Sequence, residues 1–349
     1  MKKLGICLLA IILLMGIVTG CQSEKPQPEA NQPKAAEGTN ETEEVKEEMQ
    51  KVTFVLDWLP NTNHTGIYTA LEKGYFKEEG LEVEIVQPQE GDANALVGAG
   101  KGEFGVSFQE QVTMARTSNN PIPIKAVAAI IQHNTSGFAS PVDKEIKNPK
   151  DFEGKKYGSW GTDLERAFLK TLMEKEEADF EKLEIFDIAS YDFFTSVTND
   201  VDFQWIFYGW DGIAAEVKDF PINFIKLQDV DPKLDFYTPV IITNENTIET
   251  NPELVKKFLR AATKGYEFTI EKPEEAVEYL LKHAPETDKE IAVASQKYLA
   301  GEYKKDTERW GEMKLDVWET FGNWMNDNGL LENKLDAKEA FTNEYLPEK

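Results

Sequence analysis

Residues 57–66 gather an unusual density of polar and aromatic side chains. The segment holds a carboxylate at Asp57, an indole at Trp58, a carboxamide at Asn63 and an imidazole at His64. Together these groups donate and accept hydrogen bonds and offer one flat apolar surface, which is the chemistry that recognises a small polar ligand. A simpler interpretation is a loop that caps its own helix, but a cap uses one such residue and leaves Trp58 and His64 unexplained.

The elements around this segment place it at the edge of a sheet. Residues 52–56 are β-branched or apolar and predict a buried strand. Beyond the segment, Ile67, Tyr68 and Leu71 share one helical face, and Gly74 can end that helix. Open α/β sheets place ligands at such a polar turn, because backbone N–H groups at a helix start lack partners. We therefore expect ligand contacts here.

Two more strands run into polar or aromatic residues. The strand predicted over residues 104–108 continues directly into Gln109 and Glu110. The strand predicted over residues 156–159 breaks at Trp160. Both strands alternate with helical segments, and this rhythm predicts mostly parallel sheets wrapped by helices.

A last turn of this kind follows residues 203–207. It contains Tyr208, Trp210 and Asp211, and it is flexed by glycines on both sides of the indole. Glu216 lies four residues after the second glycine and shares its helical face. This turn resembles the first in its chemistry, so we expect the two to face each other.

The beginning of the sequence predicts export. Residues 4–18 are apolar and lead into a Val-Thr-Gly-Cys run ending at Cys21. This pattern resembles the lipobox of bacterial lipoproteins, which implies a signal peptide over residues 1–20 and a lipid such as palmitate on the Cys21 sulfur. A simple membrane anchor is the alternative, but the run is shorter than the ~20 residues of a spanning helix. With Cys7 removed and Cys21 acylated, the mature chain has no free thiol.

Residues 21–50 predict a solvated tether. They are rich in Glu, contain three Pro and lack aromatic residues, so they cannot bury enough apolar surface to fold. The formal net charge of −25 argues against nucleic acid or anionic lipid as a partner of the folded part. Membrane contact is expected through the lipid anchor only.

The remaining chain predicts two lobes. Residues 51–135 and 239–349 are expected to form lobe 1, and residues 136–238 lobe 2. The chain then crosses between lobes twice, and the two crossover strands would form a hinge. Because the segment after residue 251 is almost purely helical, we expect its helices to cover lobe 1.

These features resemble type II periplasmic binding proteins, which supply ABC importers. Residues 57–66, the pair Gln109 and Glu110, and residues 205–213 resemble the branch with fungal pyrimidine synthases and bacterial pyrimidine-precursor binding proteins. The resemblance implies a monomeric lipoprotein, anchored outside the cell membrane, that captures formylaminopyrimidine for thiamin salvage and delivers it to an ABC permease and its ATPase. It implies no cofactor and no metal. Binders of riboflavin, nitrate and sulfonate share the scaffold and are alternative functions.

An aminopyrimidine needs aromatic surfaces for its faces and polar groups for its edge. The candidate aromatic side chains can stack on the ring, and a carboxylate or carboxamide can accept from an exocyclic amine. No Arg lies in the candidate turns, which disfavours a phosphate or sulfonate. The predicted ligand-binding residues are Trp58, Asn63, His64, Tyr68, Gln109, Glu110, Trp160, Tyr208, Trp210, Asp211 and Glu216.

The competing function class is an enzyme. The fungal synthases that this chain resembles use a histidine of their own chain and a Cys-rich iron-binding motif. The resemblance implies that His64 occupies the turn that carries such a histidine. No thiol survives in the mature chain, and His133 and His283 have no ligand-like spacing to His64. We therefore expect a binding protein without catalytic residues.

Overall fold

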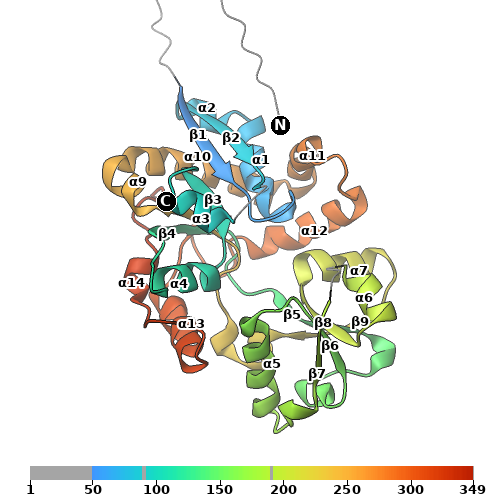
Figure 1. Cartoon of the computed structure of the whole chain (residues 1–349). Coiled ribbons are helices and arrows are strands. Elements are labelled where there is room, and N and C mark those ends of the chain that lie inside the picture. Colours follow the sequence, from blue (N-terminus) through green and yellow to red (C-terminus); the bar gives the residue numbers. More distant parts are fainter. Residues whose placement is uncertain (1–48, 89–91, 189–191, 349) are drawn as a thin grey trace, which may run out of the picture. The chain divides into compact units, whose positions relative to one another are not determined.

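The structure is a computed structural model that describes residues 49–88, 92–188 and 192–348. It contains two five-stranded sheets, shown in Figure 1. We call the first sheet and the helices packed on it the first lobe, and the second sheet with its helices the second lobe. The predicted signal peptide and nearly all of the predicted tether lie outside the described residues.

The first sheet has the strand order β2-β1-β3-β10-β4 and the second β7-β6-β8-β5-β9. The strands are β1 (Gln50–Val55), β2 (Leu81–Val86), β3 (Phe104–Ser107), β4 (Ile124–Ala129), β5 (Ser136–Pro141), β6 (Lys156–Ser159), β7 (Glu184–Asp187), β8 (Phe203–Phe207), β9 (Ile222–Lys226) and β10 (Val240–Asn244). The helices are α1 (Thr65–Glu72), α2 (Tyr75–Glu78), α3 (Ala93–Gly98), α4 (Gln109–Thr117), α5 (Asp163–Lys175), α6 (Phe193–Asn199), α7 (Ile213–Val217), α8 (Leu227–Val230), α9 (Glu245–Thr250), α10 (Pro252–Glu271), α11 (Pro273–His283), α12 (Lys289–Glu302), α13 (Leu315–Asp327) and α14 (Ala337–Ala340).

The chain crosses between the sheets twice, as predicted. After β4 it enters the second sheet at β5, and after β9 it returns to the first sheet at β10. The strands β5 and β10 are antiparallel to their neighbours, whereas the remaining pairs, such as β1 with β2 and β6 with β8, are parallel. The sheets are therefore mixed, and β5 and β10 are the two crossover strands.

Several elements have the bounds that the sequence predicts. The strands β6 and β8 match their predicted ranges, and Gly74, with a φ of 77°, ends α1 in the left-handed conformation. The strand β1 begins at Gln50, so it includes the last residue of the predicted tether. The strands β5 and β9 were not predicted.

Close packing of α1 on α10 fixes the first turn against the lobe. A Cβ atom on Gly265 would lie 2.1 Å from the Gly66 carbonyl oxygen, so only glycine allows this approach. A Cβ on Gly66 would in turn meet the ring of Tyr266. The Tyr266 hydroxyl also donates to the Asn63 carbonyl oxygen at 2.7 Å. The turn after β1 is thus held in place by α10.

The C-terminal helices do not pack on the first lobe alone, because α13 contacts the cores of both lobes. Trp318 at its start lies in a first-lobe cluster with Val240 and Ile242. One turn later, Phe321 and Trp324 lie in the core of the second lobe. The helix has enough apolar surface to contact both lobes and therefore connects them.

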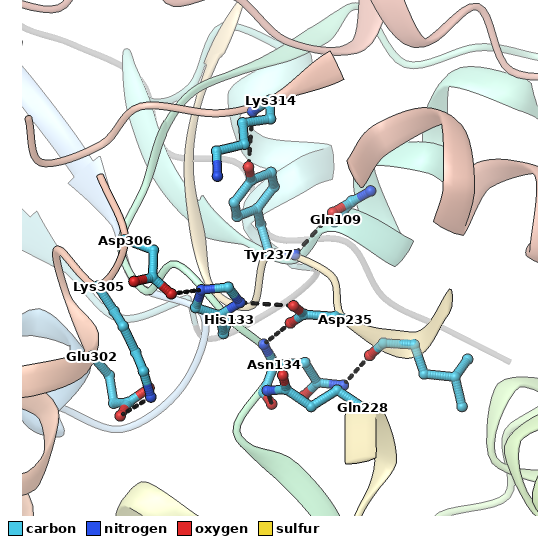
Figure 2. A network of polar contacts seen from close by, with 11 residues as sticks. Gln109, His133, Asn134, Gln228, Asp235, Tyr237, Glu302, Lys305, Asp306 and Lys314 are labelled. Atoms are coloured by element: carbon cyan, nitrogen blue, oxygen red, sulfur yellow. Dashed lines mark hydrogen bonds and ion pairs between the residues drawn. The ribbon is translucent and has the colours of Figure 1, made fainter. Parts of the chain in front are cut away.

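The two crossovers are joined by the polar network of Figure 2. His133 Nδ1 in the first crossover lies 2.7 Å from Asp235 Oδ2 in the second, and His133 Nε2 lies 3.4 Å from Asp306. The Asn134 backbone N–H donates to the other Asp235 oxygen at 2.9 Å. The hydrogen bond to Asp235 and the charges of both carboxylates raise the pKa of His133. Protonation of His133 therefore strengthens this junction.

Among the residues that the structure describes, no helix is both long and apolar enough to cross a membrane.

Candidate functional site

His64 is held by the groups of its own turn. Its Nδ1 accepts from the Asn61 backbone N–H at 3.2 Å, and its Nε2 lies 2.7 Å from Asp57 Oδ1. Because Nδ1 accepts, Nε2 carries the proton and donates to the carboxylate. The Asn61 side chain accepts from the Asn63 N–H and caps the short helix η1 (Thr62–His64). His64 is fully buried and organises the turn, so its contact with a ligand stays a prediction.

The two aromatic residues predicted at this turn have different surroundings. Tyr68 is 4% exposed, packs on Leu280 and stacks on the His283 ring with 5.0 Å between centroids. Burial, with a smaller effect of the Glu286 charge, raises the pKa of Tyr68 to about 12. Trp58 is 59% exposed. Tyr68 therefore joins α1 to α11, whereas the Trp58 ring is open to solvent and its contact with a ligand stays a prediction.

Gln109, the first residue of α4, uses its side chain to join three segments. Its Oε1 accepts from the Tyr237 backbone N–H at 2.8 Å in the second crossover, as Figure 2 shows. Its Nε2 donates to the Val317 carbonyl oxygen at 3.3 Å in α13. These two bonds occupy both ends of the carboxamide, so Gln109 positions α4 on the crossover.

Glu110, the next residue, has a buried side chain that is not fully hydrogen-bonded. It is 6% exposed, and its Oε2 has no hydrogen-bond partner among the described residues. Burial raises the pKa of this carboxyl to about 8. At neutral pH the group is therefore mostly protonated, and one of its buried oxygens has unmet bonding capacity among the described residues.

The turn η5 (Tyr208–Gly212) forms a wall of rings with its neighbours. Tyr208 lies 4.9 Å from Phe224 and 5.5 Å from Tyr298 between ring centroids. Its hydroxyl donates to Glu216, which is exposed. Burial, and then the Glu216 contact, raises the pKa of Tyr208 to about 12. Glu216 is thus already used by Tyr208, and its contact with a ligand stays a prediction.

Trp210 and Asp211 complete this turn. Trp210 is half-buried. Burial, with the nearby charge of Asp192, raises the pKa of Asp211 to about 7. Asp211 is the second predicted site residue whose carboxyl is pushed toward its neutral form.

Trp160 is half-buried at the end of β6. Its backbone N–H donates to the Glu165 carboxylate at 3.0 and 3.1 Å, and its ring lies 5.0 Å from that of Trp205. Glu165 also accepts from the Tyr157 hydroxyl at 2.6 Å and closes the capping box of α5 with Thr162. A fixed backbone therefore sets the position of the Trp160 ring.

Two rings that the sequence analysis did not select join the lobes. Phe108, directly before α4, stacks on Phe207 at the end of β8, with 6.5 Å between centroids and 22° between planes. Phe207 also lies 6.4 Å from Trp160. The carboxyl ends of β3, β6 and β8 therefore meet at one aromatic seam, formed by Phe108, Phe207 and Trp160. Each Phe is the last residue of a predicted strand, and this position at a strand end could have identified both as candidate site residues.

Ser295 in α12 links the first turn to the second, which the sequence analysis also missed. Its Oγ lies 2.6 Å from Thr62 Oγ1 and donates to the Gly209 carbonyl oxygen. A Cβ on Gly209 would lie 2.8 Å from the Leu299 side chain, so glycine allows η5 to approach α12. The two turns are therefore connected through α12.

Residues 61–276 match the model of the NMT1/THI5-like protein family. The chain belongs to this family. The match includes the aromatic seam, Glu110 and most of the first turn. It confirms the resemblance that the turns predicted.

Relatives of this chain are binding proteins as well as synthases. It is 29% identical to the formylaminopyrimidine-binding protein of Halalkalibacterium halodurans over 85% of this chain and 91% of that protein. It is 27% identical to the riboflavin-binding protein RibY of Chloroflexus aurantiacus over 99% of both chains. Other relatives of this chain are named 4-amino-5-hydroxymethyl-2-methylpyrimidine phosphate synthases.

Solved structures confirm the two-lobe fold of type II periplasmic binding proteins. The aliphatic sulphonate binding protein SsuA of Escherichia coli has a TM-score of 0.64 at 12% identity, over 83% of this chain and 97% of that chain. At this identity the likeness concerns the fold alone.

Two cavities lie away from the predicted ligand-binding residues of this chain. One of about 390 Å³ lies beside Trp318 and Leu335, and one of about 290 Å³ lies beside Lys147 and Lys226. Within the described ranges no group of three or more His, Cys, Asp or Glu is placed to hold a metal ion. The candidate site is therefore defined by the side chains that meet at the aromatic seam.

Proposed function

We propose that this protein is the substrate-binding component of an ABC importer and that it binds formylaminopyrimidine between its lobes. The observation that carries the proposal is the aromatic seam beside Glu110. Phe108 comes from the first lobe and Phe207 and Trp160 from the second. A flat ring held between them would contact both lobes at once, with each good stack adding roughly 0.5–1.5 kcal/mol beyond burial.

Charge favours a neutral ligand over an anion. Glu110 and Asp211 both have raised pKa values because of burial, and a bound anion would add repulsion to either carboxylate. The candidate turns contain no Arg to pair with a sulfonate or phosphate. A pyrimidine with donors and acceptors on its edge suits these surroundings better than a sulfonate does.

An enzymatic function like that of the synthases has less support. His64 is bonded through both ring nitrogens to Asn61 and Asp57, so neither nitrogen is available for chemistry without a change in the turn. The described part of the chain contains no Cys that could act as a nucleophile. These contacts suit a histidine that shapes a binding site.

A titration of the purified chain tests the proposal. Isothermal titration with formylaminopyrimidine, riboflavin and an aliphatic sulfonate should give the highest affinity for formylaminopyrimidine. Mass analysis of small molecules released by denaturation should identify the same compound. Tighter binding of riboflavin or the sulfonate would contradict the pyrimidine assignment and keep the binding-protein function.

Hinge closure and anchoring are the remaining parts of the proposal. Saturation with formylaminopyrimidine should decrease the radius of gyration in small-angle scattering, because the closed form makes the extra contacts. Cys21→Ala should release the protein from membranes, since the lipid is the proposed anchor. A variant that still fractionates entirely with membranes would support a spanning segment instead.

A further inference from the structure

The start of α4 leaves two buried polar atoms without partners among the described residues. They are Oε2 of Glu110, which is 6% exposed, and Oγ1 of Thr113, which is fully buried. Residues three apart lie on the same face of a helix, so both groups face the same side of α4. Folded proteins rarely leave such atoms unpaired, and each one calls for an explanation.

The surroundings place Glu110 where the two lobes and a crossover meet. Two residues before it, Phe108 stacks on Phe207 of the second lobe. One residue before it, Gln109 exchanges hydrogen bonds with both backbone groups of Tyr237 in the second crossover. In the proposed function, a ligand held at the aromatic seam lies beside the start of α4, where Glu110 is two residues from Phe108.

Among the described residues Glu110 is not paired with a cation. It forms no salt bridge in the described part of the chain, and burial is the main cause of its raised pKa of about 8. A protonated carboxyl has one O–H donor and one carbonyl acceptor side by side. That pair complements an amidine edge, which is a ring nitrogen next to a carbon that carries an amine.

We propose that Glu110 determines specificity by pairing with the amidine edge of a neutral nitrogen heterocycle. Its O–H donates to the ring nitrogen, and its carbonyl oxygen accepts from the exocyclic amine. No proton leaves the carboxyl in this pairing. The inference rests on the proposed function, because it names the group that reads the edge of the pyrimidine.

A core glutamic acid that is merely protonated is the alternative, and pH separates the two. Pairing needs the carboxyl proton, so affinity should decrease as pH rises above 8 and fall about thirtyfold by pH 9.5. Glu110→Gln keeps a donor and an acceptor side by side without a titrating proton. It should bind with an affinity within about threefold of the wild type at pH 7, and that affinity should not change up to pH 9.5.

Isothermal titration of the whole chain with two probes tests this pairing. The probes are formylaminopyrimidine and the same molecule without its exocyclic amine. In the wild type, loss of the amine should weaken binding at least about tenfold. In Glu110→Leu both probes should bind equally, because the group that reads the amine is gone. Glu302→Gln, a matched buried glutamate that pairs with Lys305, should keep the wild-type pH profile.

Each result supports or overturns one statement. A flat pH profile in the wild type, or the same loss of affinity on amine removal in wild type and Glu110→Leu, overturns the role of Glu110 and keeps the proposed function. Absence of formylaminopyrimidine binding in the wild type overturns both. If Glu110→Leu fails to fold, the pH profile of Glu110→Gln against the wild type decides.

Discussion

The turn after β1 and the start of α4 both follow strands of the first sheet, yet they treat their polar groups in opposite ways. In the first turn Asp57, Asn61 and His64 satisfy one another. At the start of α4, Gln109 is bonded at both ends, whereas the adjacent Glu110 has an oxygen without a partner. Asp57, Asn61 and His64 therefore form a scaffold, whereas the Glu110 carboxyl has unmet bonding capacity among the described residues.

Ligand contacts are expected at buried polar groups that lack a partner in the empty protein. A polar group that is satisfied within its own turn gains little from a ligand, whereas an unpaired buried group gains a hydrogen bond only when the ligand arrives. Such a group lowers the stability of the empty protein. The comparison therefore predicts opposite effects on stability for changes in the two regions.

The largest expected effect is at His64. His64→Ala empties a fully buried position and leaves the Asn61 N–H and the Asp57 carboxylate without their partner, so the free energy of unfolding should fall by about 3 kcal/mol. Urea unfolding followed by circular dichroism measures it.

Glu110→Gln should act in the other direction. The pKa of Glu110 is raised by folding, so its favourable contribution is complete below its ordinary pKa of 4.5 and is lost as pH rises through about 8. A neutral amide avoids that loss, and the variant should be more stable than the wild type by about 1 kcal/mol at pH 8 and nearly equal at pH 5. Destabilisation by Glu110→Gln at pH 8 would contradict the comparison.

Ser295→Ala should lower the stability of the protein, because it breaks the link between the first turn and η5. Gly209 and Thr62 each lose a buried hydrogen-bond partner, so the free energy of unfolding should fall by about 1–2 kcal/mol. Ser140→Ala is a matched control, since within the described ranges that buried hydroxyl makes one long bond of 3.5 Å. Equal losses in the two variants would argue against a link through α12.

His133 gives a smaller, pH-dependent effect. Its pKa is raised by folding, so its pairing stabilises the protein fully below the ordinary histidine pKa of about 6.5 and is lost as pH rises through the raised value. His133→Asn should lower the melting temperature about 2 °C more at pH 6 than at pH 8. Asp306→Asn removes only the longer contact of 3.4 Å to an exposed side chain and should have less effect.

The sequence predicted much of the fold because periodicity and turn residues are local. The β-branched and apolar run over residues 52–56 indicated β1, and Gly74 indicated the end of α1. The strand β5 was missed because its Gly137, Ser140 and Pro141 are poor strand formers, and pairing on both sides with β8 and β9 overrides that preference.

The candidate site was predictable only in its location. Strand ends identified the turns, but no local pattern shows that Gln109 is bonded to Tyr237 while Glu110 has an unpaired oxygen. Ser295 lies more than eighty residues from Gly209 in sequence, and its role depends on how α12 packs. Such tertiary contacts decide which of several polar residues remains available to a ligand.

The smallest expected effect is at Glu216, one of the ligand-binding residues that the sequence predicted. Glu216 is exposed, and its Oε1 accepts from the Tyr208 hydroxyl. Glu216→Gln keeps an acceptor for that hydroxyl at a solvated position, so stability should change by less than about 0.5 kcal/mol and ligand affinity by less than about threefold. Titration of formylaminopyrimidine against Glu216→Gln and Glu110→Leu compares the two carboxyls directly. A loss of affinity above tenfold in Glu216→Gln, with no loss in Glu110→Leu, would mean that Glu216 beside η5 binds the edge of the ligand. A carboxylate that is already bonded to a neighbouring side chain would then bind the ligand in preference to the unpaired Glu110.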